Sequence, residues 1–256
     1  VQADVLGLEI SHTDYLPLIE IAIFFILSFL LLRAIERIAP KIFTPDETDE
    51  SRLTAAEKIV LFGIAAHMAN YFYSGVKKIH LGDSPLSWVL ENQTQSLLIN
   101  ARELGQLPIG FSDTLSAFMF ETLGSLVVLN NALLLAGQLF ALIALCRVRW
   151  ALWATLFYDL THIVIFIVSG IFFYKWILFN TSIVFALETM KKKTISPLFA
   201  IVFSLAVFYA PSNFFVAHLG WWDTPALNAE RFYAITEQGE AVPIPTNYWG
   251  IFSVRF

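Results

Sequence analysis

The sequence has a single cysteine and few charged residues. Cys146 is the only cysteine among 256 residues, which excludes an intrachain disulfide and any metal cluster held by several cysteines. Charged residues make up 14% of the chain and the net charge is -5, without a basic stripe or an acidic run, so we expect no nucleic-acid partner. The sequence also lacks an internal repeat and a glycine-rich phosphate loop, which argues against nucleotide chemistry.

Apolar residues are abundant instead. The chain is 57% hydrophobic and 15% aromatic, with 24 phenylalanines, which is far from the balance of a soluble domain. The apolar residues come in blocks of about 20, the length that an α-helix needs to cross a bilayer core. The sequence therefore predicts an all-α integral membrane protein whose immediate partner is membrane lipid.

These blocks predict a polytopic bundle of about six transmembrane helices. In chain order they cover residues 16–35, 58–76, about 123–145, 150–187, which is long enough for two helices, and 195–215. Thr54 begins a capping-box pattern ahead of the second span. Gly170 lies at the weak centre of the double block, and we expect Pro211 to break the sixth span.

Two segments differ from the spans. Residues 83–120 are less apolar and predict an interfacial or re-entrant segment. Residues 217–256 are polar and rich in Pro, Trp and Tyr. We therefore expect two domains, a transmembrane domain at 1–216 and a short, β-rich extramembrane segment at 217–256 that resembles the start of a longer soluble domain.

The basic residues predict the orientation, because cytoplasmic loops collect Lys and Arg. In a layout with six spans, ten of the sixteen basic residues fall on one side: Arg33, Arg37, Lys41, Arg52, Lys58, Arg147, Arg149, Lys191, Lys192 and Lys193. We expect that side to be cytoplasmic. Both termini and the adjacent Lys77 and Lys78 then lie on the opposite, non-cytoplasmic side.

The second span carries a polar face. At about 100° per residue, His67, Tyr71, Ser74 and Lys78 lie within about 40° of one direction, whereas Lys77 points about 100° away from Lys78. Such residues are costly at membrane depth, so they mark either a site or contacts between helices. Lysines at a span end also snorkel to the interface. The alternative is that one lysine is catalytic. This requires a dry cavity, where desolvation favours the neutral amine that acts as a general base.

Other polar residues support weaker hypotheses. Asp159 and His162 are three residues apart, on adjacent positions of one helix face. The carboxylate either orients the imidazole for a function or forms a purely structural hydrogen bond with it. Glu121 could pair with Lys77, Lys78 or an arginine nearby. The five histidines show no ligand spacing, and we predict no metal site.

Three stretches resemble one known family. They are "YFYSGVKKIHLGDSPLSW", "THIVIFIVSGIFFYKWILFN" and, more weakly, "WWDTPALNAERFYAITEQGEAVPIPTNYW". The pattern of small residue, Gly, Val and Lys-Lys is similar to the membrane domain of the vitamin K-dependent γ-carboxylase and its bacterial relatives, the horizontally transferred transmembrane (HTTM) domain group. The resemblance covers most of the chain in the same order, and only the lysine motif is specific.

The resemblance implies a cavity on the outer face that binds a reduced, vitamin K-like quinone. The lysine matched by Lys78 deprotonates the quinol there, and oxygen then drives epoxide formation and carboxylation of a glutamate. By this comparison Lys78 is the catalytic base. As an enzyme, the chain would use Lys77 and His162 to position the substrate. His67, Tyr71, Ser74, Asp159 and Glu121 are the further candidates for substrate binding.

Two functions remain open from the sequence. One is a quinol-dependent carboxylase or oxidase. The other is a non-catalytic accessory subunit of a larger membrane complex, binding lipid, pigment or quinone beside other membrane subunits. A transporter ranks behind both because no inverted repeat is visible. In each case we expect a multi-pass protein of the bacterial inner membrane.

Overall fold

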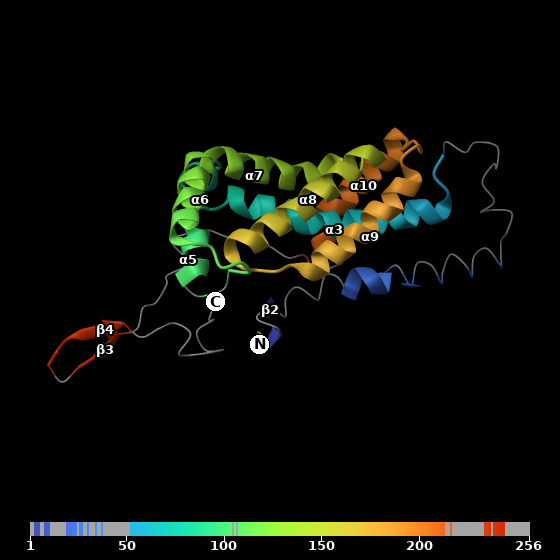
Figure 1. Cartoon of the computed structure of the whole chain (residues 1–256). Coiled ribbons are helices and arrows are strands. Elements are labelled where there is room, and N and C mark those ends of the chain that lie inside the picture. Colours follow the sequence, from blue (N-terminus) through green and yellow to red (C-terminus); the bar gives the residue numbers. More distant parts are fainter. Residues whose placement is uncertain are drawn as a thin grey trace.

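The computed structural model describes residues 52–103, 105 and 107–212, together with 3–5, 8–10, 19–24, 26–27, 30, 34, 37, 216, 233–236 and 238–243. The described chain is mostly helical, and its helices lie along one another in a bundle (Figure 1). Residues 19–24, 26–27, 30, 34 and 37 are helical, in agreement with the first predicted span. The rest of that span lies outside the described residues.

Helix α3, Ala55–Ile79, is the most deeply buried helix of the bundle. It begins at the predicted capping box, where the Thr54 side chain accepts a hydrogen bond from the Glu57 backbone N–H at 3.2 Å. The Glu57 carboxylate accepts one in return from the Thr54 backbone N–H at 2.7 Å. Gly75 allows close contact with α7, because a Cβ atom there would lie 3.1 Å from the Gln138 Cβ atom.

Four further helices pack around α3. They are α7 (Val127–Ala144), α8 (Val148–Ser169), α9 (Tyr174–Met190) and α10 (Pro197–Tyr209), which continues as the 3-10 turn η2 (Ala210–Ser212). The predicted division of the 150–187 block is confirmed: α8 ends at Ser169 and is capped by Gly170, which has a left-handed φ of 75° that favours glycine. The α-helical part of the last span ends two residues before Pro211, as expected.

The segment between α3 and α7 is made of short helices. These are α4 (Ser87–Glu91), α5 (Ser96–Glu103) and α6 (Asp113–Ser125), and Figure 1 shows α5 and α6 at one end of the bundle. The expected boundaries here were wrong. The third long helix begins at Val127 rather than near 123, because α6 continues to the weak helix formers Gly124 and Ser125 and the chain turns at Leu126.

Three of the described helices, α3, α7 and α8, are long and apolar enough to cross a membrane. Helix α9 has 17 residues, and α10 with η2 forms a shorter apolar helix at 197–212. Two antiparallel hairpins lie outside the bundle's helices. They are β1 (Ala3–Val5) with β2 (Leu8–Ile10), which was not expected, and β3 (Tyr233–Ile235) with β4 (Ala241–Pro243), within the tail for which strands were predicted.

Two of the loops with basic residues meet at the same end of the bundle. The Lys193 ammonium donates a hydrogen bond to the Arg52 backbone oxygen at 3.1 Å, and Arg52 forms a parallel β-bridge with Thr194. The Lys193 nitrogen also lies 3.7 Å from a Glu57 carboxylate oxygen. The segment before α3 and the loop after α9 therefore lie together, as the charge pattern predicted.

Candidate functional site: a cavity beside Lys78

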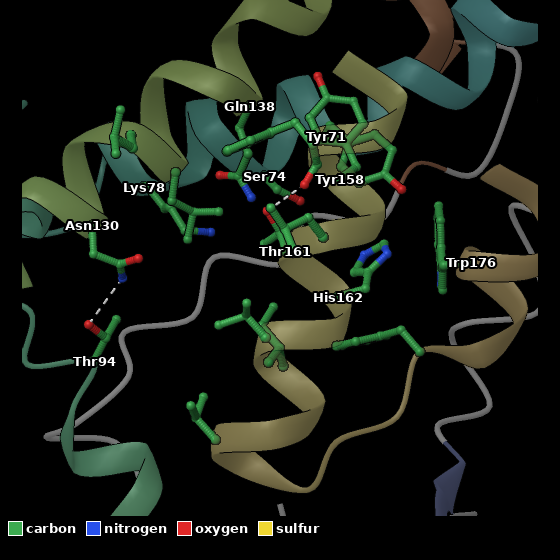
Figure 2. A pocket seen from close by; sticks show the side chains of 18 of the residues that line it. Tyr71, Ser74, Lys78, Thr94, Asn130, Gln138, Tyr158, Thr161, His162 and Trp176 are labelled. Carbon is green, nitrogen blue, oxygen red and sulfur yellow. Dashed lines mark hydrogen bonds between the residues drawn. The ribbon is translucent and has the colours of Figure 1, made fainter. Parts of the chain in front are cut away.

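A cavity of about 270 Å³ lies between α3, α7 and α8 (Figure 2). Most of its wall is apolar or aromatic, and it includes Trp88, Leu133, Leu134, Phe157, Leu160, Val164, Phe173 and Trp176. Polar groups make up a smaller part of the wall and come from Asn70, Tyr71, Ser74, Lys78, Thr94, Asn130, Gln138, Tyr158, Thr161 and His162. This combination of an apolar wall with convergent polar groups is typical of small-molecule sites.

The polar face of α3 lines this cavity. Tyr71, Ser74 and Lys78 all border it, and Lys78 is only 4% exposed. Lys77 is exposed and does not border the cavity. The helical geometry thus separated the two lysines correctly. The expectation that Lys77 also belongs to the site finds no support in its position.

Lys78 lies against an aromatic ring supplied by α4. Its ammonium nitrogen is 5.1 Å from the centre of the Trp88 ring, a cation–π distance, and Trp88 is fully buried. Asn131 of α7 fixes this short helix, since its amide donates hydrogen bonds to the backbone oxygens of Val89 at 3.2 Å and Asn92 at 2.8 Å. The amide in α7 therefore places the ring that faces the lysine.

Asn180 of α9 joins three of the predicted residues. Its carbonyl oxygen lies 2.7 Å from His67 Nε2, and its amide nitrogen donates to the Tyr71 hydroxyl and to Asp159 Oδ1, each at 2.8 Å. Because an amide oxygen only accepts, His67 carries its proton on Nε2. Tyr71 accepts from Asn180, so its own hydroxyl proton can be donated to a further acceptor.

The sequence interpretation had missed Asn180. Its signal was an asparagine within the apolar run "YKWILFNTSIVF", which is the same signal that drew attention to the polar residues of the second span. His67, by contrast, is fully buried but does not border the cavity. It supports the site through Asn180 and through its ring, which stacks on Trp176 at 5.2 Å between centroids.

His162 borders the cavity without the partner that we had expected. Asp159 is hydrogen-bonded to Asn180, and within the described residues His162 Nδ1 has no hydrogen-bond partner. The His162 ring packs against Phe173 with 5.2 Å between centroids. The hypothesis of an Asp159–His162 pair is therefore wrong, because α9 supplies an amide that the sequence spacing did not reveal.

Glu121 lies away from the cavity. It is exposed on α6, and the neighbouring Arg102 pairs with Asp113 instead. Four of the candidates are thus outside the cavity wall: His67, Lys77, Glu121 and Asp159. No group of three or more His, Cys, Asp or Glu side chains among the described residues is placed to hold a metal ion.

Three buried polar atoms of the cavity-lining residues have no hydrogen-bond partner in the described part of the chain. They are Gln138 Oε1, His162 Nδ1 and Trp176 Nε1. Figure 2 shows Lys78 and Gln138 toward one end of the cavity and His162 and Trp176 toward the other. Unpaired buried polar atoms are costly. Gln138 Oε1 only accepts and Trp176 Nε1 only donates, so a ligand whose hydroxyl groups both donate and accept would suit this arrangement.

Comparison of the chain with models of protein families, with curated proteins and with solved structures finds no match. The chemistry of the cavity therefore rests on its own geometry. It offers a buried amine, a phenol donor and an imidazole within largely apolar walls.

Proposed function

We propose that the cavity binds a reduced quinone and that the Lys78 amine takes a proton from one of its hydroxyl groups. The observation that carries this proposal is the position of Lys78, a buried amine at the edge of an aromatic, mostly apolar cavity. A planar apolar ring with polar oxygen atoms fits such walls better than a charged metabolite does. The resemblance to the HTTM group and to the vitamin K-dependent γ-carboxylase supports the same ligand.

The surroundings of Lys78 suit a proton transfer. The neutral amine accepts the hydroxyl proton, which leaves a quinolate and an ammonium ion side by side. The Trp88 ring at 5.1 Å stabilises the ammonium through its negative face. The Tyr71 hydroxyl, held by Asn180, is a donor that can stabilise negative charge on a ligand oxygen.

The resemblance also implies the chemistry after the proton transfer. Molecular oxygen oxidises the quinol by four electrons to the quinone epoxide, so that one oxygen atom enters the epoxide and the other leaves as water. In the carboxylase, the strong base formed on the way removes a glutamate γ-proton, and carbon dioxide adds to the carbanion. For the present chain, the proposed activity is quinol oxidation with Lys78 as the base, and carboxylation of a protein substrate is its extension.

The proposal places the chain in a bacterial inner membrane with about six spans. Helices α9 and α10 and the segment at 16–35 join the three long helices in crossing the bilayer. The end of the bundle that carries Arg52 and Lys193 then faces the cytoplasm, in keeping with the distribution of basic residues. The cavity and both termini lie toward the opposite side.

The test is epoxide formation from reduced vitamin K by the full chain in lipid nanodiscs. Lys78→Met keeps the length and packing of the side chain but removes the base, so we expect no turnover. Lys77→Met is the matched control, and we expect it to retain parental activity because Lys77 is exposed. Parental turnover by Lys78→Met would contradict its role.

A parent chain that binds quinol but never oxidises it would favour the second candidate, a non-catalytic membrane subunit. The apolar cavity suits bound lipid, pigment or quinone in that case as well. The distinguishing observation is a stable stoichiometric complex with other membrane proteins and no quinol turnover. Turnover by the isolated chain would exclude this candidate.

A further inference from the structure

Several residues of the cavity wall also face outward. Leu133 of α7 is 56% exposed, and Leu160 and Val164 of α8 are 60% and 42% exposed, although all three border the cavity. A side chain that borders an internal space and is also exposed marks the mouth of that space. The mouth therefore lies between α7 and α8.

The two helices are in close contact on one side of this mouth. They are joined by a turn of only a few residues and run antiparallel, and they touch tightly at Gly137, where a Cβ atom would overlap the Phe157 ring. The Tyr158 hydroxyl donates to the Gly137 backbone oxygen at 3.0 Å and holds the contact. Leu133 and Leu160 each lie about one turn beyond it in the same direction. The mouth therefore begins just beyond this contact.

The mouth faces lipid. Only 22% of the apolar window of α7 and 33% of that of α8 is buried inside the bundle, compared with 72% for α3. Helices α7 and α8 therefore present most of their apolar surface to the bilayer. The rim is mainly aliphatic, with Leu133, Leu160 and Val164, and its one polar residue among the described ones is the exposed Asn130. A water-soluble ligand would gain nothing from such a rim, whereas a ligand dissolved in the bilayer reaches it directly.

The size of the cavity limits which part of a ligand it can hold. Its 270 Å³ lies just below the range of about 300–1,000 Å³ that encloses drug-sized molecules. A ring system fits this volume, but a ring with a long hydrocarbon chain does not. A chain has to leave through the mouth.

We infer that the ligand enters sideways from the bilayer through the gap between α7 and α8, and that it carries a prenyl or similar apolar chain that stays in this gap. The inference rests on the proposed quinol site and defines its ligand class. The ring lies inside, near Lys78, and the chain passes Leu133, Leu160 and Val164 into the lipid. Specificity for the chain therefore resides in α7 and α8, away from the reacting oxygen.

The experiment compares two reduced probes in nanodiscs without oxygen: a chainless naphthoquinol and the same ring with a prenyl chain. Affinity is measured from the amount of probe that each protein retains. Leu160→Trp fills the mouth, and the matched control Ile163→Trp adds the same ring at an exposed α8 position that does not border the cavity. Leu133→Trp and Leu129→Trp form the corresponding pair on α7.

We expect both mouth variants to bind the prenylated probe about tenfold more weakly, since overpacking excludes the chain, while the chainless probe loses less than about threefold. Both controls should bind like the parent. Unchanged binding of the prenylated probe by the mouth variants, or an equal loss for the two probes, would overturn the inference. In either case, retention of the chainless probe by the parent would still support the quinol site itself. A parent that binds neither probe would overturn the inference and the quinol site together.

Discussion

Asn180 is the residue whose replacement should destabilise the bundle most for its size. Asn180→Leu keeps a similar volume but removes hydrogen bonds to His67, Tyr71 and Asp159 at 2.7, 2.8 and 2.8 Å. It leaves the fully buried His67 ring without its partner on Nε2, and Nδ1 already has no hydrogen-bond partner among the described residues. Asp159 suffers less, because it is only half-buried and also accepts from the Thr181 side chain.

The loss of unfolding free energy in Asn180→Leu depends on how deeply each of the three partners is buried. Leaving a buried donor such as His67 Nε2 unpaired costs about 1–3 kcal/mol. Interhelical hydrogen bonds of membrane proteins contribute about 0.6 kcal/mol on average and at most about 1.7, which sets the scale for Tyr71 and Asp159. We therefore expect Asn180→Leu to lower the free energy of unfolding by about 3 kcal/mol, which corresponds to a fall in Tm of about 6–12 °C for a chain of this size.

The assay is thermal unfolding in detergent, monitored by the reaction of a dye with the cysteine thiol as the bundle opens. Asn130→Leu is the matched control, since the exposed Asn130 makes only a long hydrogen bond of 3.5 Å to Thr94. We expect the control to melt within about 2 °C of the parent. If Asn180→Leu melts together with Asn130→Leu, the network around Asn180 does not stabilise the protein and the reasoning is refuted.

Three further predictions test the packing, the helix start and the orientation. Gly137→Ala should lower Tm more than Gly124→Ala, because a Cβ atom at 137 would overlap the aromatic ring that it faces on α8, whereas at 124 the nearest atom is 3.7 Å away. Thr54→Ala should cost about 1 kcal/mol in the same unfolding assay through loss of the capping box, and no change would show that the cap is redundant. In a chain without the native cysteine, Lys192→Cys and Asp83→Cys should react with a membrane-impermeant thiol reagent from opposite sides of intact membranes, and labelling from one side would contradict the proposed orientation.

Local signals of the sequence identified much of the bundle. The capping box at Thr54, the glycine at 170 and the different directions of Lys77 and Lys78 depend on spacing within one segment, and the structure agrees with all three. Helical periodicity is a property of the chain itself, so it can be read without knowledge of the neighbouring helices.

The remaining features depend on contacts between segments. Asn180 of α9 bonds to His67 of α3, 113 residues away in the sequence, and to Asp159 of α8, 21 residues away. No spacing rule connects these positions. The expected Asp159–His162 pair failed for the same reason, because a closer partner came from another helix. The boundary between α6 and α7 was misplaced because apolar composition continues across the turn at Leu126. Hydrogen-bond partners between helices and helix boundaries of this kind are set by tertiary packing, which local sequence patterns do not reveal.

The central claim is that the buried Lys78 amine takes a proton from a quinol in the cavity. The most direct measurement is the ultraviolet absorption of reduced vitamin K bound to the full chain in nanodiscs without oxygen, where a quinolate is distinguished from a neutral quinol. We expect a quinolate spectrum with the parent and with Lys77→Met, and the spectrum of the neutral quinol with Lys78→Met. A quinolate spectrum with Lys78→Met, or a neutral bound quinol with the parent, would contradict the claim.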